Sequence, residues 1–116
     1  MKRGDVVVAD FPFQDGPRSK VRPALVVQND ADNQLLENTI LAMITGNLRR
    51  ADRRMAVLVD PGMADGNGCG LHGQSLVKCG NLATVNQKRV LKVIGKLSTN
   101  LMADVDDGLK AALDLP

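Results

Sequence analysis

The residue pair with the clearest chemical potential is one arginine and one threonine that two neighbouring strands would bring together. The first apolar segment runs from Arg22 to Gln28, and the second runs from Thr39 to Thr45. The connection between them, residues 29–38, is polar and rich in turn-forming residues. Strands joined by a short connection usually pair antiparallel. If the connection folds back symmetrically, Gln28 lies opposite Thr39, and the same register places Arg22 opposite Thr45.

An arginine opposite a threonine at the end of two strands could bind a phosphate group. Directly opposed residues lie on one face of a sheet, with their Cβ atoms about 5 Å apart. The guanidinium group is a bidentate donor, and the hydroxyl group both donates and accepts hydrogen bonds. Each residue also has an ordinary structural interpretation, because Arg22 could pair with a carboxylate at the rim of the sheet and threonine is common in strands. From the residues alone, both interpretations stay open.

The rest of the sequence predicts short strands and one helix that would position this pair. Ser98 is a good N-cap for a helix from about Asn100 to Leu113, where apolar residues recur at spacings of three and four. Glycine-rich residues 61–73 predict a loop, and residues 86–89 favour one helical turn. Apolar runs predict further strands at residues 6–9, 55–59, 75–79, 82–85 and 91–97. This order is typical of a mainly β domain, a small, strongly bent antiparallel sheet or barrel with a C-terminal helix.

Composition limits the class of protein. The chain has 116 residues, which predicts a single domain spanning residues 1–116. Its formal net charge is only +2, so any interaction with nucleic acid would depend on where the cations lie. No segment is apolar enough for a signal peptide or a membrane span, and Cys69 and Cys79 lack the spacing of metal ligands or redox motifs. We therefore expect a cytoplasmic protein with reduced thiols and no metal site.

Positive charge is concentrated in two segments. Residues 49–54 hold four arginines, and the first loop contains Arg18 and Lys20 close to Phe13. Solvated surface charge is the commoner explanation for such clusters. A functional cluster would capture RNA or an acidic protein electrostatically, and its affinity would depend on salt. Phe13 could stack on a base or complete the core.

The glycine-rich loop contains a spacing that also occurs in dinucleotide-binding proteins. Residues 68–73 match G-x-G-x-x-G, but the strand expected from residue 75 leaves no helix after the motif. We therefore expect an ordinary loop in which His72, the only histidine, is exposed and incidental.

Taken together, several segments resemble the MazF/PemK family of toxin endoribonucleases. The similarity is carried by residues 2–6 (Lys-Arg-Gly-Asp-Val), 21–30 (Val-Arg-Pro-Ala-Leu-Val-Val-Gln-Asn-Asp) and 42–45 (Ala-Met-Ile-Thr). The Arg-Pro-Ala-Leu-Val-Val block is the most specific part. The tail fits as well, with Lys-Leu-Ser at residues 96–98 followed by a helix that ends in Ala-Ala-Leu at residues 111–113. The resemblance covers nearly the whole chain in the same order.

The resemblance implies an SH3-like barrel, a homodimer, a cognate antitoxin as partner, and cleavage of single-stranded RNA without a metal or cofactor. In such enzymes the ribose 2′-hydroxyl attacks the adjacent phosphate and leaves a 2′,3′-cyclic phosphate and a 5′-hydroxyl. The family's arginine corresponds to Arg22 and its threonine or serine to Thr45, and these are the expected catalytic residues. The expected substrate-binding residues are Phe13, Gln14, Arg18, Lys20, Gln28, Asn47, Arg49, Lys78 and Asn81.

The chain departs from the family's pattern at residues 78–84. Many relatives carry Arg/Lys-Cys-Asp-Gln followed by Arg-Thr, whereas this chain has Gly80 in place of the acid and Ala83 in place of the arginine. Some members use that aspartate as a base, and Asp15 is the only acid in the first loop here, so the general base stays open. Two other functions also stay open: a regulator that binds nucleic acid without cleaving it, and a gyrase poison like CcdB, which shares this fold. The lack of tryptophan counts against the second.

Overall fold

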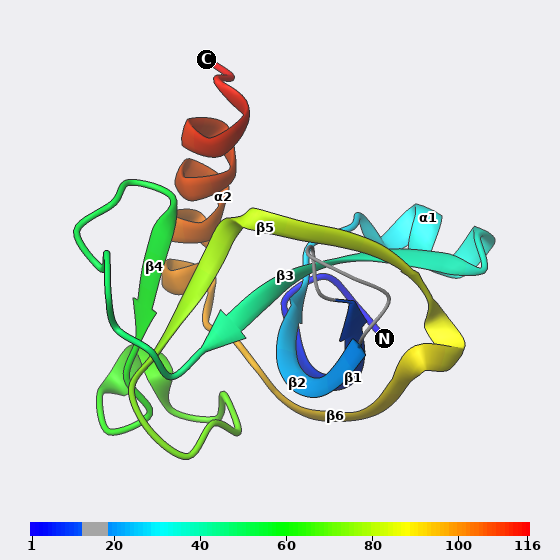
Figure 1. Cartoon of the computed structure of the whole chain (residues 1–116), viewed down its shortest axis with the longest axis horizontal. Coiled ribbons are helices and arrows are strands. Elements are labelled where there is room, and N and C mark those ends of the chain that lie inside the picture. Colours follow the sequence, from blue (N-terminus) through cyan, green and yellow to red (C-terminus); the bar gives the residue numbers. More distant parts are fainter. Residues whose placement is uncertain (13–18) are drawn as a thin grey trace.

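The computed structural model describes residues 1–12 and 19–116 and shows a bent antiparallel sheet with two helices (Figure 1). Two single 3₁₀ turns, η1 (Ala64–Gly66) and η2 (Gln87–Arg89), lie in the connections. The helices are α1 (Asp30–Leu35) and α2 (Thr99–Leu113). The strands are β1 (Asp5–Pro12), β2 (Ser19–Val26), β3 (Asn38–Thr45), β4 (Ala56–Val59), β5 (Ser75–Asn86) and β6 (Val90–Lys96). The predicted fold class, mainly β with a C-terminal helix, is confirmed.

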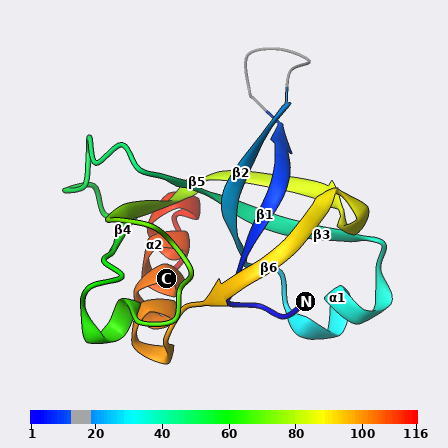
Figure 2. The same cartoon turned by 90° about the horizontal axis from the view of Figure 1, so that it is seen from below.

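The sheet curls on itself but does not close. Its strand order is β4-β5-β3-β2-β1-β6, and every neighbouring pair is antiparallel. Strands β1, β2 and β6 curl round one end of the molecule, while β4 and α2 lie at the other (Figures 1 and 2). Among the described residues no ladder joins the edge strands β4 and β6, so the bent-sheet alternative describes the fold better than a closed barrel.

The register that the sequence predicts between β2 and β3 is confirmed. Ala24 lies opposite Met43, Leu25 opposite Ala42 and Val26 opposite Leu41. The ladder as described spans these three pairs. Two residues further towards the start of β2, the same register would place Arg22 opposite Thr45.

Strand β5 is one long strand where the sequence predicts two. Along the ladder with β3, Leu82 pairs with Ala42 whereas Lys78 pairs with the next residue, Met43. Residues 79–81 therefore form an irregularity with no partner in β3, and β5 bends there (Figure 1). Because of this bend, β5 belongs both to the curled end of the sheet and to the end covered by α2.

Two apolar clusters form the core, one on each side of the bent sheet. The first includes Leu25, Ile44 and Val77 and packs against Leu101 and Val105 of α2. The second lies inside the curl and contains Val7, Ala9, Phe11, Ala24, Val26, Leu41 and Val85. Because β-strand side chains alternate, consecutive residues such as Leu25 and Val26 supply different clusters.

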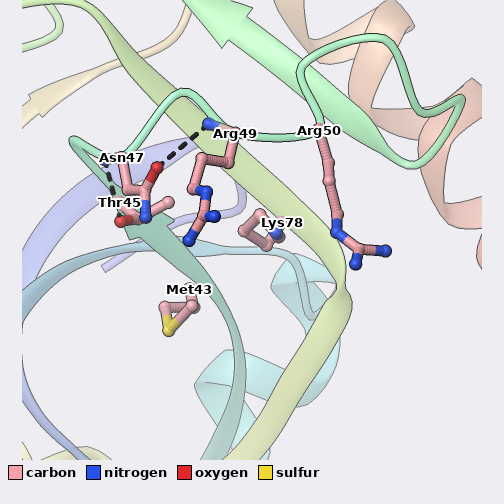
Figure 3. Close-up of a pocket in the computed structure, with 6 residues that line it drawn as sticks. All are labelled: Met43, Thr45, Asn47, Arg49, Arg50 and Lys78. Atoms are coloured by element: carbon pink, nitrogen blue, oxygen red, sulfur yellow. Dashed lines mark hydrogen bonds between the residues drawn. The ribbon is translucent and has the colours of Figure 1, made fainter.

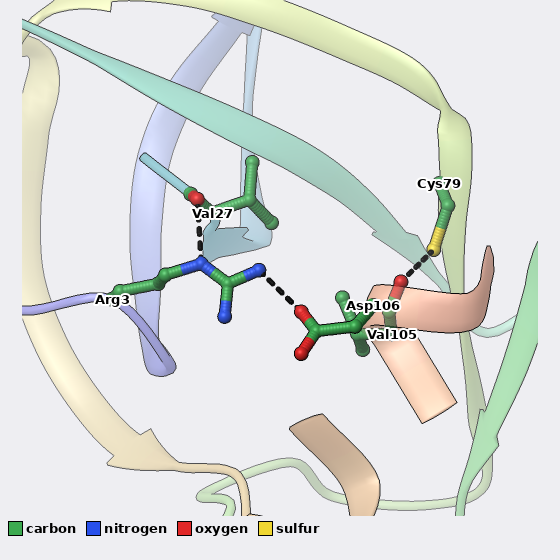
Figure 4. A network of polar contacts seen from close by, with 5 residues as sticks. All are labelled: Arg3, Val27, Cys79, Val105 and Asp106. Carbon is green, nitrogen blue, oxygen red and sulfur yellow. Dashed lines mark hydrogen bonds and ion pairs between the residues drawn. The ribbon is translucent and has the colours of Figure 1, made fainter. Parts of the chain in front are cut away.

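Helix α2 begins with the cap that the sequence predicts. The Ser98 Oγ accepts a hydrogen bond from the Leu101 N–H at 3.1 Å. A polar contact fixes the helix to the start of the chain, since the Arg3 guanidinium donates to the Asp106 carboxylate at 2.6 Å and to the Val27 carbonyl at 2.8 Å (Figure 4). No helix in the described part of the chain is long and apolar enough to cross a membrane.

The connection between β2 and β3 contains a helix that the sequence analysis interpreted as turns. Asn29 caps α1 by accepting a hydrogen bond from the Asp32 N–H. Asn33 on this helix is buried; its Oδ1 accepts hydrogen bonds from the Gln28 amide at 2.9 Å and the Thr39 hydroxyl at 2.7 Å. Gln28 and Thr39, which the predicted register places opposite each other, are therefore linked by hydrogen bonds through the Asn33 side chain.

Candidate active site

An open pocket of about 660 Å³ lies where β3 ends against β5 (Figure 3). Its described lining comprises Met43, Thr45, Asn47, Arg49, Arg50 and Lys78. Met43 and Thr45 belong to β3, Lys78 to β5, and the other three to the turn after β3. The fold thus gathers four residues that the sequence analysis assigned to substrate or catalysis: Thr45, Asn47, Arg49 and Lys78.

Two local hydrogen bonds fix the turn that forms the rim of this pocket. The Asn47 N–H donates to the Thr45 Oγ1 at 3.1 Å, and the Arg49 N–H donates to the Asn47 Oδ1 at 3.0 Å (Figure 3). Such side-chain-to-backbone bonds are why threonine and asparagine are favoured in turns. Because the Thr45 oxygen acts as acceptor, the hydroxyl hydrogen can still donate to a bound group.

The described lining is strongly cationic. It contains Arg49, Arg50 and Lys78 and no acidic residue. In Figure 3 the Lys78 side chain lies between those of Arg49 and Arg50. Lys78 is half-buried and pairs with both Met43 of β3 and Ala56 of β4, so its backbone is held on two sides. Three cations around one hydroxyl make this pocket a suitable site for a phosphate group.

Arg22 lies on the strand next to the pocket and is not part of its described lining. It is half-buried and pairs with Ala9 of β1. Residues two apart in a regular strand share a face, so Arg22 shares the face of Ala24, which lies opposite the pocket residue Met43. The sheet therefore carries Arg22 on the pocket's side, as the register predicts.

A second, smaller pocket of about 200 Å³ adjoins the first one. Arg50 and Lys78 line both pockets. The second is completed by Arg53, Met55, Ala56, Gly80 and Asn81. The predicted substrate residue Asn81 is therefore close to the first group of site residues, although it lies in the irregular part of β5.

The other predicted substrate residues either lie outside the described residues or line neither of these two pockets. Phe13, Gln14 and Arg18, together with the candidate acid Asp15, lie outside the described residues. Lys20 is exposed on β2 and lines neither pocket. Gln28 is 8% exposed and its amide donates to Asn33 and to the Asn38 carbonyl, both at 2.9 Å. The structure thus gives the predicted substrate contact of Gln28 no support.

Several residues of the two pockets were absent from the predicted site. Met43 could have been found because it lies two residues before Thr45 and so shares its face. Arg50 and Arg53 belong to the basic cluster at residues 49–54, whose charge was the only signal. Met55 carries no charge and gave no signal in the sequence, and Gly80 was noted there only because it replaces the acid of many relatives.

The remaining candidate groups do not join this site. The loop at residues 68–73 is followed by β5 rather than by a helix, as predicted, and His72 lines a different pocket with Val8 and Pro23. Burial raises the pKa of the Cys79 thiol to about 11. Among the described residues, no three His, Cys, Asp or Glu side chains form a group that could hold a metal ion.

Comparisons with known proteins identify the family of the chain. Residues 2–113 match the family described as PemK-like, MazF-like toxin of type II toxin-antitoxin system. The chain is 31% identical to "Endoribonuclease EndoA" of Bacillus subtilis over 116 residues, which cover 99% of this chain and 96% of that protein.

Solved structures share the fold. "Mycobacterium tuberculosis toxin MazF-mt6" has a TM-score of 0.78 at 24% identity, with 97% of this chain and 98% of that one covered. An endoribonuclease in complex with its cognate antitoxin, from a mycobacterial species, also has a TM-score of 0.78, at 23% identity and covering 100% and 97% of the two chains. With the family match spanning nearly all residues, the chain belongs to the PemK-like, MazF-like toxins of type II toxin–antitoxin systems.

Proposed function

We propose that this chain is a toxin endoribonuclease that cleaves single-stranded RNA. Its family supports the toxin role, and its relationship to EndoA supports endoribonuclease activity. The main structural observation in support of the proposal is the pocket that Thr45 lines together with Arg49, Arg50 and Lys78. An RNA phosphate matches this pocket in charge and in hydrogen-bonding capacity.

The proposed reaction is an internal transesterification. The ribose 2′-oxygen forms a bond to the adjacent phosphorus while the bond from phosphorus to the 5′-oxygen of the next nucleotide breaks. The 2′-hydroxyl loses a proton, and the leaving 5′-oxygen gains one. The products are a 2′,3′-cyclic phosphate and a 5′-hydroxyl, and the balance requires no metal ion, cofactor or water.

Arg22 is the proposed stabiliser of the transition state. The phosphorane carries extra negative charge on its non-bridging oxygens, and a fixed guanidinium directed at them lowers the barrier. Loss of one such donor typically reduces the rate by ~10²–10³-fold. Lysine would replace the planar fork by a single ammonium group, so Arg22→Lys should not restore full activity.

Thr45 is the proposed positioning group for the phosphate or the 2′-hydroxyl. Its oxygen accepts a hydrogen bond from the Asn47 N–H, so the hydroxyl hydrogen is still available to donate to a ligand. A hydroxyl is too weak a base to remove a proton by itself. We therefore assign Thr45 to orientation, with Arg49 and Lys78 holding the RNA backbone by charge.

A set of four variants tests these assignments. Arg22→Ala and Thr45→Ala should fold but lose most of their RNA-cleaving activity, whereas Thr45→Ser, which keeps the hydroxyl, should retain it. Arg22→Lys should remain close to Arg22→Ala. Equal activity of wild type, Thr45→Ala and Thr45→Ser would remove Thr45 from the mechanism, and unfolding of Arg22→Ala would favour a structural role for this arginine.

The proposal extends to the toxin's partners. We infer a homodimer in the cytoplasm that a cognate antitoxin inhibits by covering the cationic pocket with acidic and apolar groups. Edge strand β4 carries an exposed leucine, Leu58, beside backbone groups that pair with no further strand among the described residues, which supports an interface with another chain. Light scattering of the purified chain tests the dimer, and loss of RNA binding on addition of the antitoxin tests the shared surface.

One observation favours a second candidate, a protein that binds RNA without cleaving it. The described lining of the first pocket contains no carboxylate or imidazole that could accept the 2′-hydroxyl proton. Such a protein would retain salt-dependent RNA binding but would create no new RNA ends. The family match favours cleavage over this candidate and over poisoning of gyrase.

A further inference from the structure

We propose that a pocket between the glycine-rich loop and strands β1, β2 and β6 binds a small carboxylate with an apolar body, and that this ligand promotes RNA cleavage. The effect on cleavage rests on the proposed function, whereas the binding of the carboxylate does not. We call this site the loop pocket, and the side chains that carry the inference are Val8, Pro23, Leu71, His72, Lys92 and Ile94.

Three strands supply one wall of the loop pocket. Val8 of β1 lies opposite Pro23 of β2 on one side and opposite Lys92 of β6 on the other. Directly opposed residues share one face of a sheet. Because Pro23 follows Arg22 along the strand, this face is the reverse of the one that carries Arg22. The loop pocket is therefore distinct from the first pocket, which lies on the side of Arg22.

The loop pocket has the size and the walls of a small-molecule site. Its volume is about 420 Å³. Sites for small molecules usually measure about 300–1,000 Å³ and combine apolar walls with a few polar groups. Leu71 of the loop and Ile94 of β6 both pack against the first core cluster and also line this pocket. These two side chains, with Val8 and Pro23, provide the apolar surface.

The glycine-rich loop is held in place, so the pocket exists before a ligand binds. The Lys96 N–H donates to the Gly68 carbonyl at 3.1 Å, and the Gln74 amide donates to the Asp60 carboxylate at 3.0 Å. Gly70 has a φ of 78°, and a Cβ atom there would overlap the backbone of β6, so this close approach requires glycine. A preformed pocket loses little conformational freedom when it binds a ligand.

The charges at the loop pocket favour an anionic head group. Lys92 and His72 are exposed, and neither forms an ion pair with another described residue. The described lining contains no Asp or Glu. A carboxylate can accept hydrogen bonds from the ammonium group and from the imidazole N–H. One lysine matches the single charge of a carboxylate, whereas the first pocket, with three cations, suits a phosphate.

Gly46 connects the loop pocket to the candidate active site. Gly46 lines the loop pocket, while its two neighbours, Thr45 and Asn47, line the first pocket. The Asn47 N–H donates to the Thr45 Oγ1 across this glycine. Because glycine is the most permissive residue, a ligand against Gly46 restricts a turn that is otherwise free to change. A ligand that binds best to the turn as it stands here therefore favours the arrangement that places Thr45 in the first pocket.

Calorimetry with octanoate tests the binding site. Octanamide has the same chain without the charge and is the matched ligand. We expect octanoate to bind the wild type about threefold more tightly than octanamide, which is the size of a partly exposed charge interaction. Lys92→Met should abolish this difference. Lys96→Met, which removes a charge from the same strand outside the described lining, should retain it.

Binding and cleavage of RNA test the connection through Gly46. A 2′-O-methyl oligonucleotide lacks the attacking hydroxyl, so its affinity reports binding alone. Saturating octanoate should tighten its binding by roughly fivefold, and the oligonucleotide should tighten octanoate binding by the same factor. Cleavage of unmodified RNA at low RNA concentration should rise in parallel. Lys92→Met should cleave RNA like the wild type without octanoate and should not respond to it.

The outcomes separate this inference from the proposed activity. Equal affinity of octanoate and octanamide, or an unchanged preference in Lys92→Met, would overturn the carboxylate site. Octanoate binding that leaves oligonucleotide affinity unchanged would overturn the connection to the active site. The predicted binding results without any cleavage of RNA would retain the loop pocket and overturn the proposed activity. Equal binding of the two ligands, with weaker antitoxin binding by Lys92→Met, would overturn the inference and assign the pocket to the antitoxin.

Discussion

The charge of Lys78 should govern part of the salt dependence of RNA binding. Each phosphate that a protein neutralises on a single strand contributes about −0.7 to the slope of log affinity against log salt concentration. The described lining of the first pocket presents three cations, Arg49, Arg50 and Lys78. With each of them neutralising one phosphate along the RNA backbone, their combined contribution should be about −2. Lys78→Met removes one charge while keeping an unbranched side chain of similar length.

The expected change in Lys78→Met is a slope that is less steep by about 0.7. Between 50 and 200 mM salt this corresponds to a roughly 2.5-fold smaller loss of affinity for the variant than for the wild type. Fluorescence anisotropy with a labelled 2′-O-methyl oligonucleotide measures both slopes, because this probe binds without being cleaved.

Lys96→Met is the matched control. Lys96 is exposed on β6, opposite Asp5 of β1, and lines neither of the two site pockets. Its removal should leave the slope unchanged. A Lys78→Met slope equal to that of the wild type, or an equal reduction in Lys96→Met, would refute a local phosphate site and indicate diffuse electrostatic attraction.

Three further predictions concern the scaffold that holds the site. Gly108→Ala should destabilise the fold by about 1–3 kcal/mol despite the helix propensity of alanine, because the new Cβ would lie 2.8 Å from the Cys79 Sγ. Urea unfolding measures this loss of stability, and the loss should disappear when the same substitution is made in a Cys79→Ala background. Ser98→Ala should cost about 1 kcal/mol in urea unfolding because the Leu101 N–H loses its acceptor, and full stability without the cap would contradict this. The free energy of unfolding should fall as the pH rises from about 9 towards about 11. In this range the Cys79 thiol ionises in the unfolded chain, whereas its raised pKa in the folded protein keeps the buried thiol protonated. Cys79→Ala should lack this component of the pH dependence.

The parts of the site that the sequence predicted depend on regular repeats. The β2–β3 register followed from the symmetry of one connection, and it holds although that connection contains α1. Strand alternation then places Met43 and Thr45 on one face. Helix α2 was recognisable from the Ser98 cap and the spacing of its apolar residues.

The parts that were missed depend on contacts between different elements of the fold. Gln28 looks like a surface residue in sequence, but Asn33 and Thr39 give its amide a buried partner network. The two predicted strands at 75–79 and 82–85 are one strand, because bending at residues 79–81 preserves pairing with β3 on both sides. The close contact that a Cβ atom at Gly80 would make with Met55, a residue on another segment, is visible only in the three-dimensional structure.

Analysis of RNA ends tests the central claim most directly. A mixed-sequence single-stranded RNA is incubated with the wild type and with Arg22→Ala in excess EDTA, and the chemical identity of the new ends is determined. Our account predicts 2′,3′-cyclic phosphate and 5′-hydroxyl ends from the wild type, with little or no cleavage by Arg22→Ala. Intact RNA with folded wild type, or equal cleavage by both proteins, would contradict metal-independent transesterification supported by Arg22.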